Sequence, residues 1–205
     1  MALTSLKTVT ARINEWLSHV AQNIARHKSP YLLIVSILLI NCFIILVHGL
    51  IKYPHNYPER TVKYVLLLYV GGLVGYSINI IMESSILFYL SKRKIEGVKF
   101  INFCLGILLF SFPSILANLI NLIFPIYPSS VNDVYSIFSI SYISGLKIQN
   151  IIGQAALNML DLIEIAKVFT LSFFLKSVSK VSMINAVLLV LSVQYLLYVV
   201  SGIGL

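Results

Sequence analysis

Five long apolar stretches constrain this chain more than any other feature. A helix needs about 20 apolar residues to cross the hydrocarbon core of a bilayer, and each stretch is long enough. The runs are continuous and lack the alternation of lipid-facing strands, so they favour helices over a barrel. The chain is therefore predicted to be an all-α, polytopic membrane helical bundle with five transmembrane helices. The expected spans are residues 31–51, 64–90, 100–124, 151–175 and 181–203.

The scarcity of charge supports this prediction. Only 11% of the 205 residues are charged, and the mean hydropathy is +0.93. Soluble domains carry about 25% charged residues. A chain this poor in charge cannot cover a soluble core with a polar surface, so lipid is expected to be its main solvent. The two cysteines, Cys42 and Cys104, fall inside apolar runs and are expected to be small buried hydrophobic residues.

Residues 1–29 are predicted to form a cytoplasmic amphipathic helix ahead of the transmembrane domain, residues 30–205. Apolar side chains recur there at spacings of three and four, with cations on the other side. A helix of this kind suits the plane of a membrane interface with anionic head groups. A helix packed on the cytoplasmic side of the protein itself fits the pattern equally well. The residues expected at the membrane surface are Arg12, Trp16, Arg26 and Lys28.

Lysine and arginine residues predict the orientation. With five spans, ten of them fall on the side of the N-terminus and four on the other side. The ten lie in the N-terminal segment, in the loop 91–99 and in the turn after the fourth span. Because cytoplasmic loops carry the excess of such residues, we expect the N-terminus inside the cytoplasm and the C-terminus outside.

Small and polar residues share one face of the second span. Gly71, Gly75, Asn79 and Glu83 are spaced by four, which places them on one side of a helix. Small residues let another backbone approach closely, and polar residues below them require partners. We interpret Gly71 and Gly75 as a helix-packing seam, and Asn79 and Glu83 as part of an intramembrane polar cluster.

The fourth span is unusually polar. Gln154, Asn158, Asp161 and Glu164 fall within one arc of the helix, and Lys167 lies one turn beyond Glu164, close enough to pair with it. Each ionised side chain costs about 2.5–3.5 kcal/mol at the centre of an inserting helix. An intramembrane ionisable residue is a functional candidate, while a structural Glu164–Lys167 pair is the alternative. The pattern supports both interpretations equally.

No arrangement of residues resembles an enzyme's active site. The chain has no Walker A, GxSxG, HExxH or CxxC sequence. We therefore expect no catalytic residues, no metal and no cofactor. The formal charge is +8, but the cations form short clusters at the ends of apolar runs rather than a basic-aromatic patch. No binding of nucleic acid is expected.

Two stretches are similar to bacterial-type proteins of the Yip1 family. The family's core resembles the run ILFYLSKRKIEGVKFINFCLGILLFSFPSIL, in which a loop with Gly97 leads to Phe100 and then to Pro113. Its last two helices resemble the stretch LNMLDLIEIAKVFTLSFFLKSVSKVSMINAVLLVL, which contains Asn158 and Asp161. The chain lacks the DLYGP-type motif of eukaryotic trafficking members. The resemblance implies five helices, a cytoplasmic N-terminus and a place in a bacterial cytoplasmic (inner) membrane.

Two functional hypotheses follow. The first is a non-catalytic membrane scaffold, trafficking factor or accessory subunit that binds other membrane proteins, or a second copy of itself, through helix packing. An ABC-type exporter is one such partner that the resemblance implies. The alternative is a small transporter or channel that uses the intramembrane charges of the fourth span. Against the alternative, five spans give no obvious inverted repeat.

Overall fold

The structure is a computed structural model of the whole chain. It describes residues 2–52, 62–92, 95, 97–123, 150, 152–153, 156 and 159–203. The elements among these residues are helices, which confirms the all-α prediction, and an isolated antiparallel bridge joins Ile95 to Ser179. In chain order the helices are α1 (Ala2–Ala25), α2 (Pro30–Lys52), α3 (Val62–Ser91), α4 (Phe100–Phe110), α5 (Phe112–Ile123), α8 (Leu162–Val178) and α9 (Met183–Ile203).

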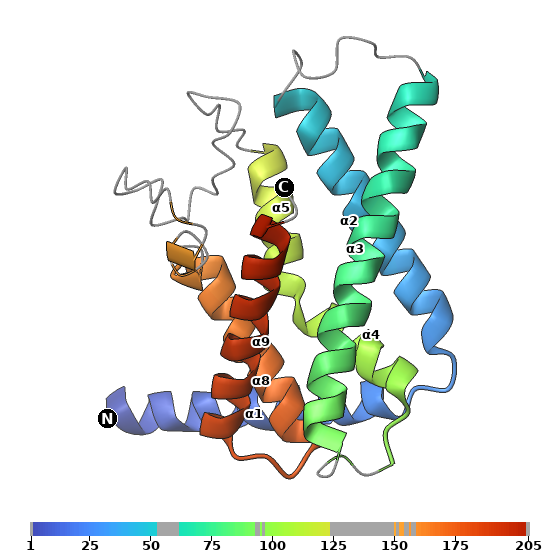
Figure 1. The fold of residues 1–205 in the computed structure, drawn as a ribbon. Coiled ribbons are helices and arrows are strands. Elements are labelled where there is room, and N and C mark those ends of the chain that lie inside the picture. The colour runs from blue at the N-terminus through green and yellow to red at the C-terminus, as the bar shows by residue number, and fades with distance from the viewer. Residues whose placement is uncertain are drawn as a thin grey trace.

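Helix α1 lies across one end of the bundle, nearly at right angles to the other helices (Figure 1). We call this end the foot, because α3 and α8 end there and α2, α4 and α9 begin there. A sharp corner separates α1 from α2, and Pro30 is the first residue of α2. Proline suits that position because its missing N–H would have no partner in the first turn of a helix.

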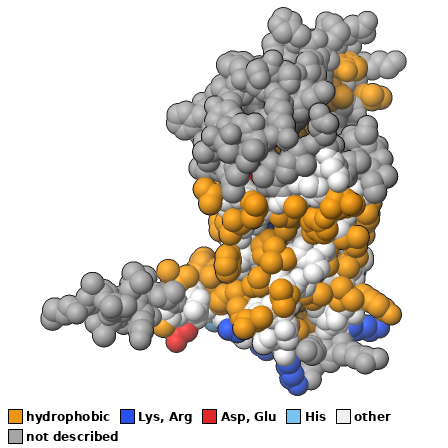
Figure 2. All heavy atoms as spheres, turned by 60° about the vertical axis from the view of Figure 1, so that its left-hand side comes forward, with side chains coloured by type: hydrophobic (Ala, Val, Ile, Leu, Met, Phe, Trp, Pro, Cys, Tyr) orange, Lys and Arg blue, Asp and Glu red, His pale blue; other side chains and the backbone are white. Residues whose placement is uncertain are grey.

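Three of the described helices are long and apolar enough to cross a membrane. The qualifying segments are Pro30–Val47 in α2, Tyr64–Ser91 in α3 and Met183–Val200 in α9. Their bounds agree closely with three of the five predicted spans, since an apolar run of sufficient length forms one continuous helix. Figure 2 shows the matching surface: hydrophobic side chains cover the body of the bundle, and the basic side chains visible in this view lie at the foot.

The third predicted span is divided into two helices, α4 and α5. The break is at Ser111, whose backbone dihedrals are φ −82° and ψ 10°. The break lies two residues before Pro113. Pro113 is then the second residue of α5, where a helix needs no N–H donor. Thr170 of α8 donates to the carbonyl of Phe110 at the end of α4, at 2.6 Å.

The fourth predicted span, residues 151–175, differs from the described helix. Helix α8 begins at Leu162 and ends at Val178. Asp161 is its N-cap: the side chain accepts a hydrogen bond from the backbone N–H of Ile163 at 2.8 Å. Asp161 therefore caps the start of α8 and does not lie on a face of the helix, as the predicted arc required.

An aromatic core joins α3, α4 and α8 near the foot. Phe103 packs against Phe88 and Phe174, with ring centroids 5.3 and 5.4 Å apart. A Cβ atom at Gly106 would lie 1.9 Å from the ring of Phe174, so the ring rests directly on the backbone of α4. This core holds α8 against α4 and sets the position of the polar side chains above it.

Candidate functional site

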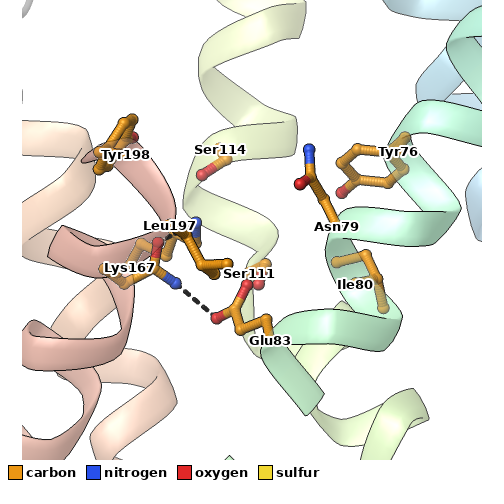
Figure 3. Close-up of a pocket in the computed structure, with 10 residues that line it drawn as sticks. Tyr76, Asn79, Ile80, Glu83, Ser111, Ser114, Lys167, Leu197 and Tyr198 are labelled. Carbon is orange, nitrogen blue, oxygen red and sulfur yellow. Dashed lines mark hydrogen bonds between the residues drawn. The ribbon is translucent and has the colours of Figure 1, made fainter. Parts of the chain in front are cut away.

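Helix α3 contributes one wall of a polar cavity in the middle of the bundle. Tyr76, Asn79, Ile80 and Glu83 recur at spacings of three and four, and all of them line the cavity. Glu83 is buried, with 4% of its surface exposed, whereas Asn79 is exposed. The expectation that Asn79 and Glu83 belong to one polar cluster agrees with this arrangement (Figure 3).

Helix α8 supplies the opposite charge. The ammonium nitrogen of Lys167 lies 3.7 Å from Oε2 of Glu164, and the two side chains are 14% and 15% exposed. The predicted pair is therefore present, at an ion-pair distance longer than a hydrogen bond. Oε2 of Glu164 is buried and accepts no hydrogen bond from the described residues. Lys167 and Glu83 line the same cavity from different helices (Figure 3).

Gln194 of α9 joins the two charged groups. Its Oε1 accepts a hydrogen bond from the ammonium group of Lys167 at 3.1 Å. Its Nε2 donates to Oε1 of Glu83, and this bond is the dashed line that ends on Glu83 in Figure 3. The result is a continuous polar chain from Glu164 through Lys167 and Gln194 to Glu83. It ties α3 to α8 and α9, which lie far from α3 in the sequence.

The chain of polar groups lies well inside the bundle. Glu83 is eight residues before the end of α3, Lys167 eleven before the end of α8, and Gln194 eleven after the start of α9. At ~1.5 Å per residue, each is about 12–17 Å from the foot. The hydrocarbon core of a bilayer is about 30 Å thick. All three positions therefore correspond to the middle of a bilayer that begins at the foot.

The break between α4 and α5 borders the same cavity. Ser111 and Ser114 line it, together with Leu197 and Tyr198 of α9, and its volume is about 190 Å³. The hydroxyl of Ser111 donates to the carbonyl of Ile107 at 2.8 Å. The hydroxyl oxygen of Ser114 is buried and has no hydrogen-bond partner among the described residues. A buried polar atom without a partner calls for an explanation, and a bound polar molecule is one.

This arrangement can bind a small polar molecule. Glu83, Gln194 and Ser114 offer acceptors, while Lys167, Ser114 and Asn79 offer donors. Glu83 and Glu164 carry two carboxylates against the single ammonium group of Lys167, so their formal charges do not cancel. Because the surroundings are apolar, these charges act on a ligand more strongly than they would in water.

The predicted glycine seam has no partner inside the described part of the chain. Gly71 and Gly75 are exposed, and a Cβ atom at either position would meet nothing within 4 Å. As a contact between helices of the same molecule, the seam is absent from the described residues. Small residues show that a backbone can approach closely, but they do not identify which one.

The other predicted residues are distributed as follows. Asn158 and Gln154 lie outside the described residues. Gly97 precedes α4 with φ +73°, a backbone conformation that favours glycine. This conformation explains why a glycine occupies the position. Phe100 begins α4 and meets the ring of Phe88 edge-on at 5.4 Å, and Pro113 is buried at the start of α5.

The four residues expected at the membrane surface are all exposed at the foot. They are Arg12, Trp16, Arg26 and Lys28. The sequence interpretation missed Gln194, which completes the polar chain. One signal for it was available, because Gln194 is an amide side chain in the middle of the apolar helix α9. It also missed Gly106, whose role depends on a ring 68 positions away in the chain and leaves no local pattern.

Among the described residues, no group of three or more His, Cys, Asp or Glu side chains is placed to hold a metal ion. Cys42 and Cys104 are buried and unpaired, as expected. No family model, no curated protein and no solved structure matches this chain.

Proposed function

We propose that the protein is a small membrane transporter or channel that binds a polar solute in the cavity between α3, α5, α8 and α9. The observation that carries this proposal is the convergence of Glu83 and Lys167 on one cavity, joined by Gln194. Ionisable side chains inside a membrane are costly and generally mark substrate or ion pathways. A purely structural pair would need only Glu164 and Lys167, whereas here a third helix brings a second carboxylate.

The broken third span adds support. Substrate sites of many transporters lie near the bilayer midplane, beside helices that are interrupted there. Ser111 interrupts the α4–α5 run at the wall of the cavity. In this proposal the chain crosses the membrane five times, through α2, α3, the α4–α5 pair, a fourth span that contains α8, and α9. The foot then lies on the cytoplasmic side, in keeping with the basic side chains there.

Ligand-dependent stability tests this function. The purified chain is heated in mild detergent with a panel of small solutes: sodium, ammonium, methylammonium, acetate, phosphate and glycine. A solute that binds only the folded state stabilises it by about 2.7 kcal/mol at 100 times its Kd. We expect at least one class to raise the thermal midpoint. Glu83→Gln, which keeps the shape but removes the charge, should abolish that rise.

Glu15→Gln is the matched control, because Glu15 is an exposed carboxylate on α1, away from the cavity. It should retain the full effect. A shift that survives Glu83→Gln would show that the solute binds elsewhere. If no member of the panel shifts the wild-type midpoint, the charges are structural and the scaffold hypothesis takes precedence.

A second candidate function, a scaffold or accessory subunit of Yip1 type, is favoured by the exposed glycine pair. Gly71 and Gly75 leave room for the backbone of another membrane protein, such as an exporter subunit, or of a second copy. Gly75→Leu should then abolish co-purification of a stoichiometric partner from mild detergent and leave the thermal midpoint of the isolated chain unchanged. Leu66→Ala, at an exposed position on the opposite face of α3, is the control.

A further inference from the structure

Helix α1 has a docked segment that is tied to the bundle. Ala21 and Ala25 are buried, and Leu17, Val20 and Ile24 pack against the aromatic core. The amide of Asn102 in α4 donates to the carbonyls of Ala25 and His27, at 2.8 and 3.0 Å. These bonds satisfy carbonyls at the end of α1 that would otherwise lack partners. Residues 17–25 are therefore held against α4 and α8.

The preceding turns of α1 carry the same apolar face past the edge of the bundle. Ile13 is four residues before Leu17 and so lies on the docked face, yet it is 50% exposed. Trp16 is 65% exposed, and Arg12 and Glu15 beside it are exposed as well. Figure 1 shows the N-terminal half of α1 extending sideways along the foot, past α8 and α9. No described residue of the chain covers Ile13 and Trp16.

The surroundings of this projecting segment indicate what covers it. The docked face of α1 points toward the bundle, so Ile13 faces the level at which α2, α3 and α9 begin or end. If those helices cross a membrane, that level is the boundary between head groups and acyl chains. Further exposed cations lie at the foot: Arg26, Lys28, Lys92, Lys99, Lys176 and Lys180. The one exposed acid among the described residues there is Glu15.

We infer that residues 11–16 of α1 form a membrane-surface anchor that inserts Ile13 and Trp16 into a leaflet rich in anionic lipid. Apolar insertion and attraction between cations and anionic head groups act together in such helices. The docked segment makes the anchor rigid, because residues 17–25 cannot turn without losing the contacts to α4 and α8. The bilayer surface and the helix that carries Lys167 are thereby joined through one rigid element.

Trp16 is the only tryptophan of the chain, so its fluorescence reports the anchor in the intact protein. The full chain is reconstituted in nanodiscs of phosphatidylcholine, with and without phosphatidylglycerol. We expect a blue-shifted emission and quenching by brominated acyl chains, both stronger with phosphatidylglycerol and weaker at high salt. Each basic residue near an anionic surface contributes about 1 kcal/mol, so Arg12→Gln should lower the insertion equilibrium about fivefold.

Gln22 lies on the opposite, exposed face of α1. A Trp16→Phe/Gln22→Trp variant is therefore the matched control, and its emission should report water in both lipid mixtures. The inference is wrong if Trp16 is quenched by aqueous acrylamide as fully as the control and ignores brominated lipid. It is also wrong if Trp16 is shielded only at high protein density, because a second copy would then cover the segment.

Discussion

At the scale of single residues, two glycines of similar sequence context have opposite roles. Gly106 lies under the ring of Phe174, where an added Cβ would be 1.9 Å from a ring carbon. Gly75 has nothing within 4 Å of that position. The difference follows from packing, since the same small residue permits close approach in one place and borders open space in the other.

The two positions give a matched test. Gly106→Ala forces Phe174 out of its place, and overpacking of this kind costs about 1–3 kcal/mol. Gly75→Ala meets no atom and improves helix propensity, so the thermal midpoint in detergent should stay the same or rise. Equal losses in the two variants would mean that the Phe174 ring does not rest on α4.

The charged residues beside the cavity should stabilise one another. Lys167→Met leaves Glu164 and Glu83 buried without a cation, and such a loss costs about 3–5 kcal/mol. Adding Glu164→Gln removes one of the two uncompensated charges and should restore part of the stability. Thermal midpoints of the two single variants and the double variant measure the coupling. Additive losses would contradict the Glu164–Lys167 pair.

At the scale of elements, the helices fall into two groups. Helices α2, α3 and α9 are explained by their own apolar length, whereas α1, α4 and α8 depend on one another. Helix α1 rests on α4 and α8 through Asn102 and the aromatic core. The contact of α1 with α4 and α8 therefore holds the helices together at the foot.

Asn102→Leu tests this contact between α1 and α4. The substitution removes both hydrogen bonds to the end of α1 and leaves the carbonyl of Ala25 buried without this donor, which costs about 1–3 kcal/mol. Amide hydrogens of residues 17–25 should exchange faster, as measured by mass spectrometry. Asn185→Leu, at an exposed position of α9, is the control and should leave exchange in α1 unchanged.

Sequence reasoning was effective where a single helix decides the outcome. The runs that became α2, α3 and α9 have bounds set by the thickness of a bilayer, which is a local requirement. It was less effective for α8, because Asp161 fits both a polar helix face and an N-cap, and the cap is the form observed. The Glu83–Gln194 contact depends on tertiary structure, since no local pattern relates α3 to α9.

At the scale of the whole molecule, the direction of the helices groups the cations. The four exposed surface residues of α1 and its corner share the foot with Lys92, Lys99, Lys176 and Lys180. Three regions of the sequence, residues 12–28, 92–99 and 176–180, thus meet at one end. The predicted orientation places this end in the cytoplasm.

Cysteine labelling of intact cells measures the orientation. Cys42 and Cys104 are buried, so Cys42→Ser/Cys104→Ser provides a clean background. A cysteine at His55, between α2 and α3, should react with an impermeant reagent from outside. Cysteines at Lys28 and Lys180 should react only after permeabilisation. If the cysteine at Lys180 reacts from outside while the cysteine at Lys28 does not, the predicted single crossing between α5 and α9 is wrong.

The distance along the chain between Glu83 and Gln194 also has a consequence in time. The two residues are 111 positions apart. A ribosome adds about 5–20 residues per second, so Glu83 is made some 5–20 s before its partner exists. During that interval the carboxylate of α3 must be kept hydrated, or held by the insertion machinery. Assembly of the polar chain is therefore complete only when α9 has been made, and slow translation of α9 prolongs the interval in which Glu83 has no partner.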